Sequence, residues 1–142
     1  MTVAPGSILT WLAVREALLS RGVRGGTFLD AGCGEGWMTK QLMSLGMEGV
    51  AIEPSLAAYS RALNRLHPRF QFQVDVLNLP LTELKLERNF DLGCAFTVIE
   101  HVTDDASFLK ELKMRVRRGG GLSSQFLPAK TNGRLRTIWL DI

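Results

Sequence analysis

The residues best suited to chemistry form one glycine-rich run, Leu29-Asp30-Ala31-Gly32-Cys33-Gly34-Glu35-Gly36. A short apolar stretch precedes this run and an apolar-periodic stretch follows it, which predicts a strand, a tight turn and a helix. Glycines in such a turn let a ligand approach the backbone closely, and they adopt torsions that a side chain would block. We therefore expect a ligand to bind at this turn.

The type of ligand follows from the residues around the glycines. Trp37 occupies the third glycine position of the G-x-G-x-x-G fingerprint, so the run is not a nicotinamide or flavin site. The Gly-Lys-Ser/Thr ending of a phosphate-binding P-loop is also missing. Asp30, directly before the glycines, would repel a pyrophosphate and attract a cation such as the ammonium group of an amino acid. The run thus favours a ligand with a positive end.

Two more carboxylates are expected near this turn. Glu53 stands twenty-one residues after Gly32 at the expected end of the second strand, where a carboxylate can accept hydrogen bonds from both ribose hydroxyls. Asp75 is expected to end the third strand, where it could accept from an adenine amino group. Together the three acids predict a pocket for an adenosine with a cationic amino-acid tail. The structural alternatives remain open: Asp30 and Glu53 could cap the helices that follow them, and Asp75 could shape a turn.

The elements that would position these residues alternate between helix and strand. We expect helices at 7–21 (capped by Ser7), 37–45 (closed by Gly46), 54–66 (opened by Pro54 and ended by Pro68) and 103–118 (capped by Thr103). We expect strands at 27–31, 49–53, 70–74, 90–97 and, after a break at Gly119–Gly121, at 122–127, with a loop and one helical turn at 77–85. This alternation predicts an α/β fold: a doubly wound, mostly parallel sheet with helices on both faces.

The order and spacing of these motifs resemble those of the class I, Rossmann-like S-adenosylmethionine-dependent methyltransferases. The run 29–36 is similar to the first motif of that family, and Glu53, Asp75, 90–92 and 98–102 fall where its later motifs lie. Residues 108–128 are similar to its fifth-strand unit, so the resemblance covers about residues 25–128. The Glu-His-Val run at 100–102 resembles small-molecule methyltransferases of the ubiquinone-type O-methyltransferase kind.

The resemblance implies S-adenosyl-L-methionine as the cofactor and a small-molecule acceptor of an O- or N-methylation. The cofactor-binding residues that it implies are Asp30, Gly32, Cys33, Gly34, Gly36, Glu53, Pro54, Asp75, Val76 and Thr97. Among these, Asp30, Gly32 and Gly34 would hold the methionine part. Glu53 would bind the ribose, Asp75 and the Val76 backbone would bind the adenine, and Thr97 would lie near the sulfonium and the acceptor.

Two side chains near the acceptor carry the expected catalytic roles, His101 and Thr97. His101 could act as a general base toward an acceptor hydroxyl, or it could be structural at the start of a helix; both interpretations stay open. Some relatives bind a divalent metal at this motif, but Thr97 stands where their first glutamate would be, so we predict no metal site. Because the sulfonium methyl is already activated, we expect the protein mainly to align the acceptor and exclude water.

The charge distribution and the cysteines bear on the partners and the cellular location of this chain. Eight basic residues and one acidic residue lie between Lys110 and Arg136, which indicates either a surface for an acidic ligand or a solvated helix end. Aromatic residues do not alternate with these charges, which argues against a nucleic-acid partner. No apolar run approaches the length of about 20 residues that a membrane helix needs, and no export signal is recognised. With Cys33 and Cys94 as reduced thiols, we expect a cytoplasmic location.

The length of 142 residues, 46% of them apolar and 22% charged, indicates one globular domain and excludes a disordered chain. We expect a cofactor-binding core at 1–128 and a C-terminal tail at 129–142. The sheet of the family has seven strands ending in a hairpin, whereas the tail has residues for one short strand or helix only. The fifth strand would then be an exposed edge, which a second copy or a partner chain could cover. The alternative function is a non-catalytic or truncated cofactor-binding module that acts through a partner.

Overall fold

The computed structural model describes residues 5–96, 98, 102–126 and 136–141. The helices and strands are α1 (Pro5–Ser20), β1 (Gly26–Ala31), α2 (Trp37–Ser44), β2 (Met47–Ile52), α3 (Leu56–Phe70), β3 (Val74–Leu77), the 3-10 turn η1 (Leu81–Glu83), β4 (Phe90–Phe96), α4 (Asp105–Met114), β5 (Val116–Phe126) and β6 (Arg136–Asp141). The strands form one sheet in the order β3-β2-β1-β4-β5-β6. Strands β1 to β5 are parallel, and β6 runs antiparallel to β5.

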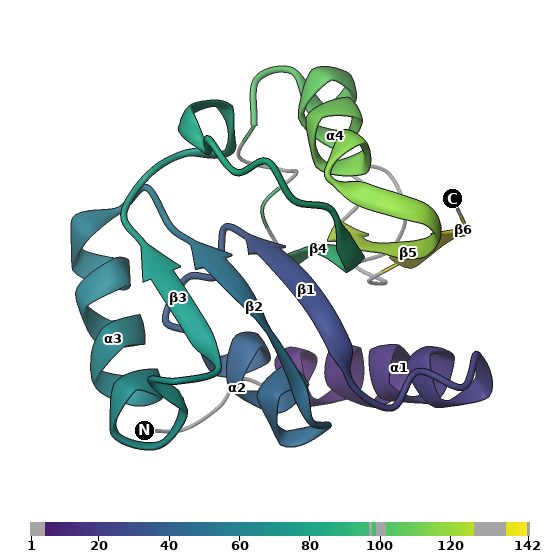
Figure 1. Cartoon of the computed structure of the whole chain (residues 1–142), viewed down its shortest axis with the longest axis horizontal. Coiled ribbons are helices and arrows are strands. Elements are labelled where there is room, and N and C mark those ends of the chain that lie inside the picture. Colours follow the sequence, from purple (N-terminus) through teal and green to yellow (C-terminus); the bar gives the residue numbers. More distant parts are fainter. Residues whose placement is uncertain (1–4, 97, 99–101, 127–135, 142) are drawn as a thin grey trace.

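Helices cover both faces of this sheet, as the alternating pattern predicts (Figure 1). On one face α1, α2 and α3 bury Leu18, Leu42 and Leu66 against the strands. On the other face α4 and η1 bury Leu112 and Leu81. Residues along the central strands alternate between these two cores, so both faces of the parallel sheet are apolar. The doubly wound α/β fold is confirmed.

The strand order places a crevice beside the glycine-rich run. The chain winds from β1 to β2 and β3 on one side, then returns to place β4 and β5 on the other side of β1. Because the winding reverses between β1 and β4, the connections leaving these two strands diverge at their carboxyl ends. The run that follows β1 therefore lies at the switch point of the sheet, where such folds bind ligands.

Several helix boundaries differ from the sequence prediction. Ser7 lies inside α1 and does not cap it. Ser55, one residue after Pro54, caps α3: its hydroxyl accepts from the Ala58 N–H at 3.4 Å. Pro68 lies within the last turn of α3, where it is exposed and solvent can replace the backbone hydrogen bond that proline removes. Because α3 continues to Phe70, β3 begins at Val74 and not at residue 70.

The last helix and the strand after it also differ from the prediction. Asp104 caps α4 in place of Thr103, since its carboxylate accepts from the Ser107 N–H at 3.0 Å. Arg117 and Arg118 belong to β5, not to the end of the helix. The three glycines at 119–121 do not break the chain before the strand. They lie within it, where the β4–β5 register slips between Phe90 and Leu92 and the chain bulges opposite the intervening residue.

Strand β6 changes the expected edge of the sheet. It pairs with β5 from Gly121↔Asp141 to Phe126↔Arg136. The prediction that the fifth strand is an exposed edge is therefore wrong, because the C-terminal segment supplies the one short strand for which it has residues and covers β5. A second copy or partner chain is not needed to cover β5. Among the described helices, none is long and apolar enough to cross a membrane.

Candidate functional site

The glycine-rich run forms a tight connection from β1 to α2 at the switch point. Gly32, Gly34 and Gly36 have φ angles of 80°, 57° and 76°, in the left-handed region that side chains disfavour. The N–H groups of Gly32 and Cys33 both donate to the Ile52 carbonyl, at 2.8 and 2.9 Å. These two bonds fix the start of the run against the carboxyl end of β2.

The three glycines serve different purposes. A Cβ at Gly36 would lie 3.0 Å from Leu66 Cδ1, so this glycine lets α3 pack closely against the start of α2. A Cβ at Gly32 would overlap the side chain of Val98. A Cβ at Gly34 would meet none of the described atoms within 4 Å. Gly34 thus faces open space, and its backbone is accessible to a ligand.

Glu35 ties the tip of this run to α3. Its carboxylate lies 2.7 Å from Arg61 Nε and 3.7 Å from Arg65 Nη2. Arg65 Nε also donates to the Glu35 carbonyl at 2.9 Å. Because both the backbone and the side chain of Glu35 are held, the glycine run is preorganised.

Asp30 is a buried carboxylate that lacks one partner. Its side chain is 1% exposed, and Oδ2 accepts from the Thr39 hydroxyl at 2.6 Å. The other oxygen, Oδ1, is buried with no hydrogen-bond donor among the described residues. Burial raises the pKa of Asp30 to about 6. The hydrogen bond from Thr39 acts in the opposite direction and lowers this pKa, whereas the negative charge of Glu53 raises it further. A cation placed near Oδ1 would stabilise this carboxylate.

Glu53 is held by backbone donors at the end of β2. Its side chain is 9% exposed; Oε2 accepts from the Gly34 N–H at 2.9 Å and Oε1 from the Ser55 N–H at 2.8 Å. Each carboxylate oxygen can accept a second hydrogen bond. Asn78 fixes the same corner, because its Nδ2 donates to the Glu53 carbonyl at 2.8 Å and to the Pro54 carbonyl at 3.1 Å. The carboxylate is therefore oriented and can still bind two ligand hydroxyls.

A cavity of about 510 Å³ opens between the glycine run and the α4 side of the sheet. It brings together Gly32, Gly34, Glu53 and Pro54 of the predicted site. The rest of its wall is mostly apolar: Ala31, Ile52, Pro80, Leu81, Thr82, Phe96, Val98, Val102 and Phe108. A neighbouring cavity of about 320 Å³ shares Leu81, Thr82, Val102 and Phe108 with it. Together the two cavities form one space that is polar beside the glycine run and Glu53 and mostly apolar toward α4.

Asp75 and Val76 do not line this cavity. Strand β3 extends to Leu77, whose carbonyl accepts from the Glu53 N–H at 3.0 Å, so the prediction that Asp75 ends the strand is wrong. Asp75 pairs with Val50 within the strand, is exposed and borders a small depression that Arg88 also lines. Val76 is buried in the core on the α3 face. The residue that stands next to Glu53 after β3 is Asn78.

Of the other residues discussed in the sequence analysis, some pack against the core and others lie outside the residues that the structure describes. Cys33 is buried in the core, and burial followed by the charge of Asp30 raises the pKa of its thiol well above the ordinary range. The thiol therefore stays protonated at neutral pH, and the predicted cofactor contact of Cys33 stays a prediction. Trp37 is half-buried and packs against the same core. Thr97 and His101 lie outside the described residues, so their predicted roles stay predictions. The described residues contain no group of three or more His, Cys, Asp or Glu able to hold a metal ion.

Three residues of the site were not predicted from the sequence. Thr39 holds Asp30, Asn78 holds the end of β2, and Phe108 of α4 closes the apolar wall. The only sequence signal for Thr39 was its hydroxyl group, which lies on the buried side of α2 nine residues after Asp30. The position of Asn78 depends on the β2–β3 register and had no signal in the sequence.

Residues 29–123 match the family model described as "Methyltransferase domain". Over 82 residues the chain is 37% identical to the ubiquinone biosynthesis O-methyltransferase of Rhodopseudomonas palustris, which covers 57% of this chain and 32% of that protein. Over 95 residues it is 36% identical to a probable S-adenosylmethionine-dependent methyltransferase of Mycobacterium tuberculosis, with 66% and 32% covered. The chain thus spans about a third of the length of these curated relatives.

A solved structure shows the same fold. The magnesium protoporphyrin IX methyltransferase of Synechocystis PCC 6803, crystallised with bound S-adenosylmethionine, aligns with a TM-score of 0.76 and 21% identity, over 88% of this chain and 61% of that one. The glycine run, the buried acids and strands β2 to β4 all fall within the residues that match the family model. Since that model covers more than half of the chain, this protein belongs to the methyltransferase domain family.

Proposed function

We propose that this chain binds S-adenosylmethionine in the 510 Å³ cavity and that the domain transfers the methyl group to a small-molecule acceptor. The observation that carries the proposal is the Asp30 carboxylate, buried behind the glycine run with one oxygen that lacks a donor among the described residues. A buried carboxylate of this kind is costly unless a cation pairs with it. The ammonium group of a methionine tail is such a cation.

The residues present fit this cofactor. The exposed backbone at Gly34 allows the methionine part to approach, and Glu53, oriented by two backbone N–H groups, can accept from the two ribose hydroxyls. When bound, the cofactor supplies a methyl group that its sulfonium activates toward nucleophiles. The protein then has to orient the acceptor and exclude water, which is the contribution expected of the apolar wall around Phe96 and Phe108.

The adenine contacts expected of Asp75 and Val76 stay predictions from the family resemblance. The exposure of Asp75 and the position of Asn78 beside Glu53 support a different arrangement in this chain, in which the end of β3 forms the adenine side of the pocket. Comparing the cofactor affinity of Asp75→Asn with that of Asn78→Ala distinguishes the two arrangements. The larger loss identifies the side of the strand that adenine contacts.

An acceptor with an apolar body is supported by the two adjoining cavities. Leu81, Val102 and Phe108 line both of them, so an apolar surface continues from the cofactor cavity toward α4. The names of the relatives differ in this respect: one is a ubiquinone biosynthesis O-methyltransferase and another is a malonyl-[acyl-carrier protein] O-methyltransferase. His101 remains the proposed base for an acceptor hydroxyl, with a structural role as its alternative, and Thr97 remains the proposed neighbour of the sulfonium.

A second candidate function is a cofactor-binding module without turnover of its own. The observation that favours it is the coverage, since the chain spans only about a third of the curated relatives. The buried and unpaired Cys33 and Cys94 support the reducing, cytoplasmic setting that we propose for either function. Calorimetry tests whether the chain binds S-adenosylmethionine. Release of S-adenosylhomocysteine then distinguishes a methyltransferase from a cofactor-binding module without turnover.

The experiment titrates the chain with S-adenosylmethionine and with NAD, and then measures turnover on phenolic and amine acceptors. We expect binding of S-adenosylmethionine without binding of NAD, followed by acceptor-dependent formation of S-adenosylhomocysteine. Cofactor binding without turnover on any acceptor would favour the module. Binding of NAD with no response to S-adenosylmethionine would overturn the proposal, because Trp37 and Asp30 would then have been misinterpreted.

A further inference from the structure

Thr39 carries a hydroxyl on the side of α2 that packs against the sheet. Its side chain is fully buried, at 0% exposure, and the other buried residues of α2 are the apolar Met38, Leu42 and Met43. A buried hydroxyl costs free energy unless it is hydrogen-bonded, and valine has a similar shape without that cost. The presence of a threonine here is therefore explained by what its hydroxyl binds.

The Thr39 hydroxyl binds a carboxylate and not the backbone of its own helix. A threonine in a helix commonly donates to the carbonyl four residues earlier, which for Thr39 is the Glu35 carbonyl. That carbonyl accepts from Arg65 Nε at 2.9 Å. The Thr39 hydroxyl donates instead to Asp30 Oδ2, at 2.6 Å. Helix α2 thus supplies a donor to the carboxylate at the end of β1.

This hydrogen bond determines which oxygen of Asp30 is left for a ligand. Oδ2 is engaged by Thr39, whereas Oδ1 is buried without a donor among the described residues. Rotation of the carboxylate about its Cβ–Cγ bond would break the hydrogen bond to Thr39, so Oδ1 is held in one direction. An acceptor that is already oriented binds its ligand with a smaller loss of side-chain entropy.

Three other titratable groups lie near Asp30 on the strands and in the glycine run. The charge of Glu53, at the end of β2, raises the pKa of Asp30. Cys94 is the β4 partner of Asp30 in the strand register, and Cys33 follows it in the glycine run. Burial and then the charge of Asp30 raise the pKa of both thiols, so they stay neutral. None of these three groups supplies a positive charge to Asp30.

No described helix adds a positive charge that lowers the pKa of Asp30. Arg61 and Arg65 of α3 lie against the Glu35 carboxylate. The described buried residues of α1, none of which is ionisable, are Thr10, Val14 and Leu18. The hydrogen bond from Thr39 therefore lowers the pKa of Asp30 without help from a cation of the described residues.

We propose that Thr39 is a positioning residue for the cofactor, whose hydroxyl fixes the Asp30 carboxylate so that Oδ1 is held for the ammonium group of the methionine tail. By donating to the carboxylate, Thr39 also favours the ionised form that pairs with a cation. The inference rests on the proposed binding of S-adenosylmethionine, and it assigns the pH dependence of that binding to one hydrogen bond.

The test compares two ligands by calorimetry between about pH 5.5 and about pH 7.5. S-adenosylmethionine carries the ammonium group, whereas methylthioadenosine lacks the amino-acid tail and reports on the rest of the pocket. The variants are Thr39→Val, which removes the hydroxyl, and Thr39→Ser, which keeps it. Any ionisation of the ligand itself is the same for every protein, so it cancels in the comparison.

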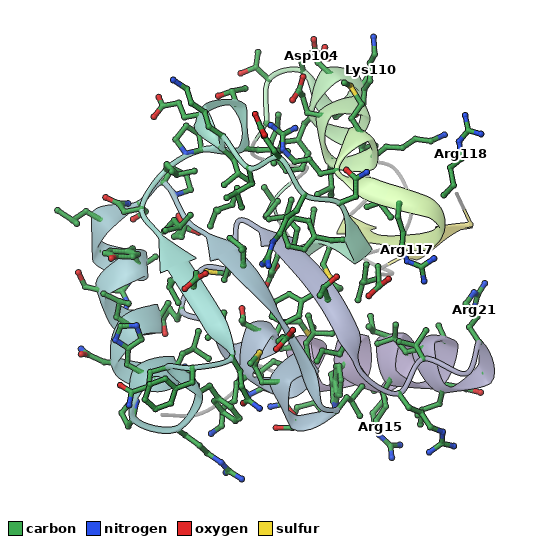
Figure 2. The ribbon with its side chains drawn as sticks, in the orientation of Figure 1. Arg15, Arg21, Asp104, Lys110, Arg117 and Arg118 are labelled. Carbon is green, nitrogen blue, oxygen red and sulfur yellow. The ribbon has the colours of Figure 1, made fainter. Side chains whose placement is uncertain are left out.

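Thr27→Val is the matched control. It also removes a hydroxyl that donates to a carboxylate, in this case to Asp91 Oδ2 at 3.2 Å. The pair lies near the amino ends of β1 and β4, at the opposite edge of the sheet from the glycine run. Arg117 donates to the same carboxylate, and Figure 2 shows Arg117 on the side of the molecule away from α2 and α3.

We expect Thr39→Val to weaken the binding of S-adenosylmethionine by about tenfold near neutral pH and that of methylthioadenosine by less than about twofold. The affinity of the unmodified chain for S-adenosylmethionine should rise as the pH passes through about 6, where Asp30 ionises. In Thr39→Val this rise should move to higher pH, because the hydroxyl no longer lowers the pKa of Asp30. Thr39→Ser and Thr27→Val should follow the unmodified chain.

Equal losses for both ligands in Thr39→Val would overturn the inference, because Thr39 would then support the pocket as a whole. An unchanged affinity and pH profile would also overturn it, and so would a loss in Thr39→Ser as large as in Thr39→Val. If Thr39→Val does not fold, Thr39→Ala makes the same comparison, since it also lacks the hydroxyl. Failure of the unmodified chain to bind S-adenosylmethionine is a distinct result, which would overturn the proposed function and this inference with it.

Discussion

Replacing Asp30 with asparagine tests how this fold holds a buried charge for its ligand. The side chain keeps its shape, and an amide oxygen can still accept from the Thr39 hydroxyl, which now lies 2.6 Å from Asp30 Oδ2. The variant removes the charge whose burial raises the pKa of this group to about 6. We expect Asp30→Asn to change the pH dependence of folding stability and to weaken cofactor binding.

The magnitude follows from the pKa. A rise from 3.8 to about 6 corresponds to a free energy of about 3 kcal/mol that disfavours the ionised carboxylate in the folded state. The native state binds the proton more tightly than the unfolded chain, so this group favours folding most when both states are protonated, below about pH 4. The advantage is lost as the pH rises through about 6. About half of the change, roughly 1.5 kcal/mol, falls between about pH 5 and about pH 8.

The assay compares urea unfolding of the unmodified chain and of Asp30→Asn at both pH values. The difference in unfolding free energy between the two proteins should shift by roughly 1.5 kcal/mol in favour of Asp30→Asn as the pH rises. Any constant cost of burying the amide cancels in this comparison. Asp75→Asn is the matched control, since the same replacement at an exposed carboxylate should give no such shift. A difference that stays constant with pH would refute the reasoning that burial destabilises the charged form of Asp30.

Further predictions concern the glycine run and Glu53. Glu53→Ala should lower cofactor affinity by about ten- to a hundredfold and Glu53→Gln by less, because a hydrogen bond to a charged acceptor contributes about 1.5–3 kcal/mol; calorimetry measures both. The same Ala variant should also lower the unfolding free energy by about 1–3 kcal/mol, since the N–H groups of Gly34 and Ser55 lose their acceptor. Gly36→Ala should cost about 1–3 kcal/mol in urea unfolding, because its φ of 76° is strained for alanine and its Cβ would lie 3.0 Å from Leu66; an unchanged midpoint would contradict this. Gly34→Val should lower the unfolding free energy, because its φ of 57° is strained for valine, and it should abolish cofactor binding in the molecules that circular dichroism shows to be folded, because the side chain would enter the open space that the ligand needs; unchanged affinity in the folded variant would place the cofactor elsewhere.

The sequence by itself determined the fold class and the polar end of the site. The alternation of apolar runs with glycine breaks is local information, so β1, α2 and β4 lie within one or two residues of their predicted bounds. The glycine run and Glu53 could be placed at one edge because parallel strands share their carboxyl ends. Their spacing also carried the family resemblance, which the matching family model confirms over residues 29–123.

Tertiary structure decided what depends on register and on contacts between distant residues. The position of Asp75 within β3, and therefore of Asn78 beside Glu53, follows from the pairing Ile52↔Leu77, which no local pattern specifies. The pairing of β6 with β5 required two segments to meet across the intervening connection. The Asp30 oxygen that lacks a donor among the described residues exists only after folding, because burial is a property of the packed chain. Strand register is set by the sum of many weak side-chain contacts, so it appears only when both strands and the helices over them are in place.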